Sequence, residues 1–238
     1  FRLPCTSARQ RVRLVIHFYC LKIFMRRTKE EADNTRTAIL TAAELLFLKK
    51  GVSHTSLEQI ARQAGVTRGA VYWHFQNKAH LFNEMLNQVR LPTEQMAKQI
   101  SQCDPNNPIV GLRYLCTEVL LTVGSNERKR RILTILQRRC EFTADLREAE
   151  ERHEAYINEF IDLCEQLFSQ PSTAARLYAG ITPRMAAISL HTMLLGLLTN
   201  WLRDPTLFDV ALAGPMLDGL FRGIITDWEP SDDCKDHP

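Results

Sequence analysis

The chain has 238 residues, of which 45% are apolar and 24% are charged, and its formal net charge is +3 at pH 7. This is the composition of an ordinary globular protein of one or two domains, long enough to bury a sizeable core. The sequence contains no GxSxG, GxGxxG, P-loop, HExxH or EF-hand motif, and its seven cysteines show neither CxxC nor Cys/His ligand spacing. These features argue against an enzyme, a metal site and a bound cofactor, and they favour reduced thiols in a cytoplasmic protein.

Charge is distributed unevenly along the chain. Residues 1–25 carry five Lys or Arg and no acid, residues 26–90 carry ten against six acids, and residues 91–238 carry fifteen against twenty-one. This distribution is expected of a protein whose basic N-terminal part, here called the head, binds a polyanion. The acidic remainder, here called the body, would not bind it.

The segment ahead of Met25 is basic and apolar, as a signal peptide would be. Its apolar run is interrupted by His17 and Lys22, and no small-residue cleavage site follows, so export is not expected. We expect an N-terminal extension outside the fold. The alternative is a basic arm that contacts nucleic-acid phosphates.

Residues 28–50 are predicted to form the first helix of the fold. Gly51 follows Lys49 and Lys50 as a C-terminal stop, and the two cations complement the helix dipole. The apolar side chains repeat at helical spacing and predict a buried stripe of Ile39, Ala43, Leu46 and Phe47.

The stretch 55–82, TSLEQIARQAGVTRGAVYWHFQNKAHLF, predicts two short helices joined by a tight turn. Thr55 or Ser56 is placed to cap the first helix, Gly65 gives the turn a permissive backbone, and Thr67 is placed to cap the second. Small residues allow the two helices to cross closely, which is the pattern of a helix-turn-helix. The expected buried positions are Leu57, Ile60, Ala61 and Ala64, followed by Val66, Ala70, Val71 and Phe75.

The outward face of the second helix carries large aromatic side chains beside cationic ones. Exposed aromatics of this kind mark contact surfaces. The major groove of DNA admits one α-helix, and phosphate donors with flat side chains suit it. We therefore expect double-stranded DNA to bind the face formed by Arg68, Gly69, Tyr72, Trp73 and His74.

The same stretch closely resembles the DNA-binding domain of TetR-family transcriptional repressors. The run T-R-G-A-x-Y-W-H-F is similar to that of AcrR-like repressors, which control multidrug efflux pumps, and Phe142 ends a C-E-F run seen in that subgroup. The resemblance implies an all-α fold, in which an N-terminal three-helix DNA-binding domain with the helix-turn-helix precedes a larger helical ligand-binding and dimerisation domain. The expected parts are an extension at 1–25, the DNA-binding domain at 26–79, the effector-binding and dimerisation domain at 80–228, and a tail at 229–238.

Seven residues match positions that commonly contact DNA in the TetR family. Arg68 is expected to bind a base edge, and Gly69 is expected to allow close approach. Tyr72, Trp73, His74 and Lys78 are expected mainly to hold phosphates and set the register, Lys78 from the start of the next helix. The matched residues are Thr67, Arg68, Gly69, Tyr72, Trp73, His74 and Lys78.

Beyond residue 80 the sequence contains only helical patterns and helix breakers. Pro92 is expected to interrupt the helix that leaves the head, and the segment 104–108, DPNNP, is a clear breaker. Further helices are expected after Pro108, after Asn126, and over 145–169, 184–203 and 210–225, with a loop between Pro171 and Gly180.

The helix expected over 184–203 is almost wholly apolar, and its length is near the lower limit of a membrane span. Polar residues such as His191 and Asn200, and the absence of a second such segment, argue against a lipid-facing helix. We expect it to be buried partly in the core and partly in an oligomer interface, with no membrane partner. Together with 210–225 it would form the four-helix interface of a homodimer.

By resemblance to the efflux-repressor subgroup, a pocket is expected among the helices after Pro108, Asn126 and Pro183. A small hydrophobic or amphipathic effector in this pocket would wedge the head-bearing helix and move the two heads of the dimer apart. Arg90 stands where some subgroup members carry an acidic group that helps to bind cationic dyes, so a preference for cations is in doubt. The candidate wall residues are Val89, Leu112, Leu115, Cys116, Val119, Leu133, Leu136, Gln137, His191, Leu194, Leu195 and Leu198.

The sequence therefore predicts a ligand-responsive transcriptional repressor that controls a multidrug efflux operon. As a dimer it would bind a pseudo-palindromic operator, with its heads spaced by a helical turn of ~34 Å or a multiple. The alternative is a DNA-binding activator or architectural binder without a small-molecule effector, which would need no cavity. An enzyme with an accessory DNA-binding domain is the third class, and the catalytic residues it requires are not found.

Overall fold

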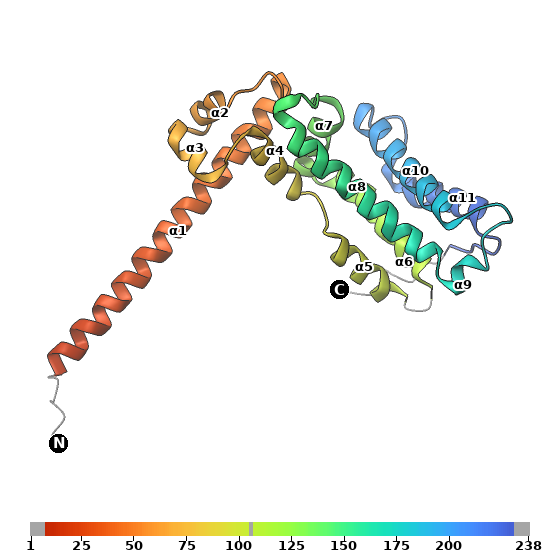
Figure 1. The fold of residues 1–238 in the computed structure, drawn as a ribbon, viewed down its shortest axis with the longest axis horizontal. Coiled ribbons are helices and arrows are strands. Elements are labelled where there is room, and N and C mark those ends of the chain that lie inside the picture. Colours follow the sequence, from red (N-terminus) through yellow and green to blue (C-terminus); the bar gives the residue numbers. More distant parts are fainter. Residues whose placement is uncertain (1–7, 105–106, 231–238) are drawn as a thin grey trace.

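The computed structural model describes the backbone of residues 8–104 and 107–230 and the side chains of residues 29–104 and 107–230. Within these ranges the regular elements are helical, apart from an isolated bridge between Leu177 and Ile225 (Figure 1). Residues 1–7 of the expected extension and 231–238 of the expected tail lie outside the described residues. The elements are α1 (Ala8–Lys50), α2 (Leu57–Ala64), α3 (Arg68–His74), α4 (Lys78–Asn87), α5 (Thr93–Cys103), α6 (Pro108–Ser125), α7 (Glu127–Arg138), η1 (Ala144–Leu146), α8 (Arg147–Phe168), α9 (Pro171–Ala174), α10 (Pro183–Arg203), η2 (Val210–Leu212) and α11 (Ala213–Ile224).

The first helix is longer than the sequence predicted. It begins at Ala8 rather than at Thr28 and continues unbroken to Lys50. Its N-terminal part extends away from the rest of the molecule (Figure 1). Among its described side chains, Ile39, Ala43 and Phe47 are fully buried. Apolar periodicity located this packed part, because only a helix that buries one face carries such a signal.

The two helices of the helix-turn-helix form as predicted. The hydroxyl of Ser56 caps α2 by accepting from the Gln59 N–H at 3.2 Å, and the Gln59 side chain accepts from the Ser56 N–H at 3.1 Å. This reciprocal pair is a capping box. Gly65 takes the left-handed conformation (φ 68°) in the turn, and Thr67 caps α3 by accepting from the Ala70 N–H.

The apolar core of the head continues into the body. The rings of Phe47 from α1 and Phe82 from α4 meet edge to face at 6.0 Å, with Val71 of α3 and Phe75, which follows that helix, in the same cluster. Elements beyond the head add to this cluster, so head and body are packed together rather than joined by a linker. The added side chains are Ile132 and Ile135 of α7, Leu146 of η1 and Ala149 of α8.

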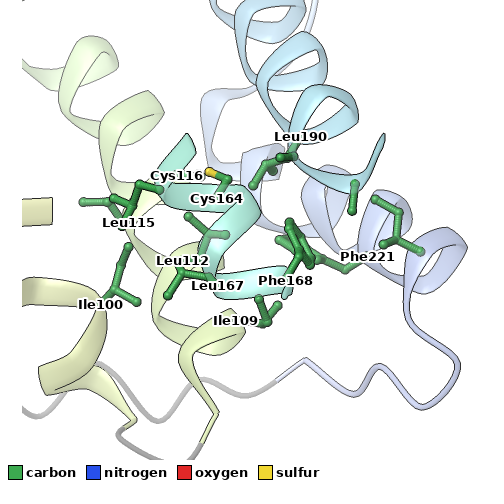
Figure 2. Close-up of a cluster of buried hydrophobic side chains, with 14 of the residues drawn as sticks. Ile100, Ile109, Leu112, Leu115, Cys116, Cys164, Leu167, Phe168, Leu190 and Phe221 are labelled. Carbon is green, nitrogen blue, oxygen red and sulfur yellow. The ribbon is translucent and has the colours of Figure 1, made fainter. Parts of the chain in front are cut away.

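A second core lies within the body (Figure 2). It joins buried side chains of α5, α6, α8, α10 and α11, among them the fully buried Phe168 and Phe221. Gly111 allows α5 and α6 to cross closely, because a Cβ atom there would stand 2.4 Å from the Ile100 carbonyl oxygen. Close packing of this kind gives the body a rigid frame around its interior.

A buried ion pair ties α6 to α11. The Arg113 guanidinium donates to both carboxylate oxygens of Asp218, at 3.0 and 2.8 Å, and the two side chains are only 11% and 5% exposed. The indole N–H of Trp228 also donates to Asp218, at 3.2 Å. A bidentate pair with a further donor meets the demands of a carboxylate removed from water.

One face of α10 is exposed to solvent, because no other element of the described chain covers it. In the described part of the protein, α10 is the one helix long and apolar enough to cross a membrane, yet only 28% of its most apolar window is buried. Ala186 and Leu190 lie in the body core, whereas Met185 is 51% exposed and Ile188 is 45% exposed. Exposed apolar side chains gathered on one helix face are typical of a surface that contacts a partner.

The described cysteines are not all reduced thiols. Cys116, Cys140 and Cys164 are free, and burial raises the pKa of Cys116 and of Cys140 to about 12, so both stay protonated. Cys103 is in a disulfide, which corrects the expectation for that residue. Spacing along the sequence does not report which side chains a fold brings together.

Candidate functional sites

The outward face of α3 presents the residues that the sequence singled out. Trp73 is 74% exposed and Tyr72 is 46% exposed. The Arg68 guanidinium lies over the Tyr72 ring, 5.4 Å from its centroid, and donates to the Tyr72 hydroxyl at 3.3 Å. His74 meets the Trp73 ring edge to face at 4.5 Å. These contacts order a cationic and aromatic surface that the protein leaves open to solvent.

The opposite face holds α3 rigidly in the head. Val71 and Phe75 are fully buried in the head core. The Arg36 guanidinium of α1 lies 5.4 Å from the centroid of the Phe75 ring and forms an ion pair with Glu84 of α4. Because α1 and α2 pack against α3 behind this face, its outward side chains are carried on a fixed helix, as a nucleic-acid reader requires.

Thr67 has a structural role in the fold, whereas Gly69 has none that requires glycine. The Thr67 hydroxyl already accepts from the Ala70 N–H at 3.1 Å as the cap of α3. Gly69 is exposed, and a Cβ atom there would meet nothing closer than the Thr67 hydroxyl at 3.8 Å. The folded chain therefore does not require glycine at this position, which leaves close approach of a binding partner as a reason for it.

Lys78 lies where α4 begins, as predicted, but its ammonium group is already engaged. It donates to the carbonyl oxygens of Val52 and Ser53, at 3.2 and 3.4 Å, and lies 2.8 Å from an Asp145 carboxylate oxygen. Its side chain is 13% exposed. The expectation of a phosphate contact is not supported by this placement, because three partners occupy the three N–H donors of a lysine.

An apolar cavity of about 320 Å³ lies in the body. Of the twelve wall residues expected from the sequence, eleven line it, and the exception is Leu112. Leu112 is fully buried in the body core among the side chains of Figure 2 and does not reach the cavity. Helical periodicity showed that Leu112 faces inward but could not separate the core from a cavity wall. The eleven are Val89, Leu115, Cys116, Val119, Leu133, Leu136, Gln137, His191, Leu194, Leu195 and Leu198.

Eight further residues line the cavity and were absent from the expected wall. They come from the end of α4 and the loop after it, from α5 and from α8. The long apolar pattern of α8 indicated a core helix and nothing more. The added wall residues are Leu86, Arg90, Leu91, Met96, His153, Tyr156, Ile157 and Phe160.

One end of the cavity is polar. The Arg90 guanidinium lies 2.9 Å from Nδ1 of His153 and 4.9 Å from the centroid of the Tyr156 ring. Burial lowers the pKa of His153 to about 4, and the adjacent Arg90 adds to this, so the imidazole is neutral near pH 7. Burial also raises the pKa of Tyr156, whose hydroxyl donates to the Leu91 carbonyl at 3.3 Å. The polar end therefore consists of one cation and two neutral rings.

The cavity reaches the elements that carry the head. Leu86 in α4 and Val89 just after it line the cavity, and α4 begins in the head at Lys78. Leu133 and Leu136 of α7 form part of the same wall. On another face of α7, Arg131 donates to the buried carboxylate of Glu44 in α1 at 2.6 Å. A bound ligand would thus touch two helices that contact the head directly.

Comparisons with known proteins agree with this architecture. The family described as bacterial regulatory proteins, tetR family, matches residues 39–85, and the MAATS-type transcriptional repressor C-terminal region matches residues 107–226. The HTH-type transcriptional regulator AcrR of Shigella flexneri is 36% identical over 185 residues, which cover 78% of this chain and 86% of that protein.

Two solved structures extend the comparison to three dimensions. NalD, the secondary repressor of the MexAB-OprM multidrug efflux pump in Pseudomonas aeruginosa, is 60% identical, with a TM-score of 0.80 over 84% of this chain and 100% of that chain. SmeT in complex with triclosan is 29% identical, with a TM-score of 0.72 over 86% and 99% of the two chains. SmeT is the repressor of the Stenotrophomonas maltophilia multidrug efflux pump SmeDEF.

Proposed function

The chain belongs to the TetR family of bacterial transcriptional regulators, which is not a family of enzymes, and we propose that it is a ligand-responsive repressor of a multidrug efflux operon. It binds a pseudo-palindromic operator as a homodimer in the cytoplasm and is released by small hydrophobic compounds. Residues 26–79 form the DNA-binding domain, and residues 80–228 form the effector-binding and dimerisation domain. The transcriptional regulator AcrR and the efflux-pump repressors NalD and SmeT support this assignment.

The exposed face of α3 is the surface that enters the major groove. Arg68 reads a base edge, Gly69 lets the helix approach closely, and the phosphates are held by the side chains around them. Support comes from the exposure of Trp73 and Tyr72 on a helix whose other face is locked in the head core. The proposed contact residues are Thr67, Arg68, Gly69, Tyr72, Trp73 and His74.

The homodimer forms through α10 and α11. The open apolar face of α10 includes Met185 and Ile188, and α11 packs beside α10. Gly219 and Gly223 of α11 are exposed, and a Cβ atom at either would meet nothing within 4 Å. Small residues one helical turn apart allow a second pair of helices to approach closely, and a two-fold axis then repeats the same contact.

The body cavity is the effector site, and α4 carries the signal to the head. A ligand can shift the equilibrium only if it binds the DNA-incompetent state more tightly than the DNA-bound state. Leu86 and Val89 place the end of α4 in the cavity wall, so a ligand that displaces them also displaces the start of α4 in the head. The two heads of the dimer then no longer match two half-sites spaced by a helical turn.

The observation that carries the proposal is the exposed Trp73 beside Arg68 on a rigid helix. Fluorescence anisotropy with labelled DNA from upstream of the protein's own gene tests it, with triclosan as the added compound. We expect tight binding by the wild type, release by triclosan, and loss of binding in Trp73→Ala. Tyr178→Ala is the matched control, because Tyr178 is also an exposed aromatic (44%) but lies in the body.

The outcomes separate the candidate functions. Equal DNA binding by Trp73→Ala and the wild type would remove α3 as the reading helix. Operator binding that neither triclosan nor a panel of other antibiotics, dyes and biocides weakens would favour an activator or architectural binder without an effector. Turnover of a bound compound would favour an enzyme with an accessory DNA-binding domain.

A further inference from the structure

The apolar cavity contains a single guanidinium group with no carboxylate beside it. Arg90 lies in the segment between α4 and α5 and lines the cavity wall. Among the described residues that line this cavity, none is Asp or Glu. The ion pairs formed within the described part of the chain include none with Arg90. The cavity wall thus carries a formal charge of +1.

The partners of Arg90 position the guanidinium without neutralising it. The neutral imidazole of His153 meets it at 2.9 Å, and the Tyr156 ring lies 4.9 Å away. Tyr156 is held by its hydrogen bond to the Leu91 carbonyl, and His153 stacks on Phe142, with 6.2 Å between the ring centroids. Burial lowers the pKa of Arg90, as expected for a cation partly removed from water. This arrangement leaves an oriented cation whose charge the protein does not compensate.

Such a cation discriminates between ligands by their charge. An anionic group that pairs with Arg90 would compensate for the hydration that the guanidinium lost on burial. Guanidinium binds planar and tetrahedral oxyanions with paired hydrogen bonds. A cationic ligand in the same cavity would meet repulsion in a medium that screens charge poorly. The rest of the wall, which includes Met96 and Leu198, is mostly apolar and binds the hydrophobic part of a ligand without distinguishing its charge.

We propose that the cavity selects amphipathic anions, with an apolar ring or chain among the aliphatic side chains and one acidic group on Arg90. The proposal rests on the proposed function in taking this cavity as the effector site, and it adds the chemical class of the effector. Carboxylates, sulfonates and phenolates share the required chemistry. His153 and Tyr156 are positioning residues that aim the guanidinium.

Two fluorescent probes test the proposal because they differ in one group. Anilinonaphthalene sulfonate carries a sulfonate on the same two aromatic systems that form the neutral N-phenylnaphthylamine. Both are titrated against the full-length wild type, Arg90→Gln and Arg152→Gln. Arg152 is the matched control, since it also lies on the body but is exposed and paired with Glu148 at 2.7 Å.

We expect Arg90→Gln to weaken the binding of the sulfonate by about tenfold or more, as for loss of a charge-assisted hydrogen bond. Binding of the neutral probe should change by less than about threefold, which also shows that the cavity is intact. Arg152→Gln should bind both probes as the wild type does. An equal effect of Arg90→Gln on both probes, or no effect on either, would overturn the proposal.

A second measurement needs no variant and decides the matter if Arg90→Gln does not fold. Decanoate and decyltrimethylammonium, both below their micelle concentrations, compete with N-phenylnaphthylamine for the wild-type protein. We expect decanoate to displace the probe at a concentration at least about tenfold lower than decyltrimethylammonium needs. Equal potency of the two compounds would overturn the proposal. If neutral compounds still release the operator while anions have no advantage, this inference fails and the proposed function stands. If no compound binds or releases DNA, the proposed function fails as well.

Discussion

Lys78→Met tests whether this lysine contacts DNA or holds the head in place. In the structure the ammonium group has three partners, namely Asp145 at 2.8 Å and the Val52 and Ser53 carbonyls at 3.2 and 3.4 Å. These partners lie in η1 of the body and in the loop between α1 and α2, so the lysine joins three parts of the chain. The structure therefore assigns it to the junction of head and body.

The expected loss of stability follows from these contacts. Hydrogen bonds from a charged group contribute about 1.5–3 kcal/mol, whereas exposed ion pairs contribute about 0–1 kcal/mol. Asp145 is 56% exposed and the two carbonyl contacts are long, so we expect a total loss of about 1–3 kcal/mol. For a chain of this length the corresponding fall in Tm is about 2–12 °C. Circular dichroism during thermal unfolding measures it.

The salt dependence of operator binding separates the two roles. Each phosphate contact adds about 0.9 to the slope of log K against log salt, so one contact in each head would add about 1.8. We expect Lys78→Met to keep the wild-type slope and to lose stability. Lys98→Met is the control, because Lys98 is exposed on α5 and its loss removes the same charge. A slope lowered by about two units with an unchanged Tm would refute the reasoning.

Three further results are expected. Trp73→Ala should weaken operator binding at least about tenfold in anisotropy while leaving Tm unchanged, because the side chain is 74% exposed. Asp218→Ala should cost about 3–5 kcal/mol in urea unfolding, because it leaves the Arg113 guanidinium buried without its partner. The pKa of His153 is about 4 in the folded protein and 6.5 in the unfolded chain. Between pH 4 and pH 6.5 this imidazole is therefore protonated in the unfolded chain and neutral in the folded protein. Stability should therefore fall as the pH falls through this window, by about 1–2 kcal/mol because solvent screens the half-buried imidazole, and His153→Gln should remove this part of the pH dependence.

Local chemistry made the head predictable from sequence. The Ser56 and Thr67 caps, the Gly65 turn and the apolar stripes act within a few residues, so the sequence pattern determines where α2 and α3 begin and end. The exposure of Trp73 followed from the same periodicity, because the opposite face of α3 had to be buried. The wall of the cavity was expected from the resemblance to the efflux-repressor subgroup, because periodicity shows which helical residues face inward but not which of them border a cavity.

Long-range pairs could not be read in the same way. The partners of Lys78 lie 25, 26 and 67 positions away, and His153 lies 63 positions from Arg90. A lysine at a helix start fits a phosphate site and a structural contact equally well until the fold places Asp145 beside it. Likewise, α8 showed only a core pattern, and nothing in its sequence indicated that His153 and Tyr156 would face Arg90. Such residues acquire their roles from the arrangement of helices, not from spacing.

The junction of head and body explains why the head should move as a unit when the cavity fills. Its apolar part is closely packed, with Ile132 and Ile135 of α7 fully buried in the head core, and packed cores switch between arrangements rather than deform continuously. Its polar part includes the pair of Lys78 and Asp145, whose carboxylate is 56% exposed, so water can solvate that carboxylate at a cost of about 0–1 kcal/mol when the pair opens. The pair of Arg131 with the buried Glu44 carboxylate is expected to stay closed, because opening it would leave a buried charge unpaired. A ligand that gains a few kcal/mol more in the displaced state can therefore exchange the polar contacts while the head core stays intact. A head that stays intact keeps its DNA-reading face, so under the proposed function we expect release of the operator to come from the relative position of the two heads and not from unfolding of α3.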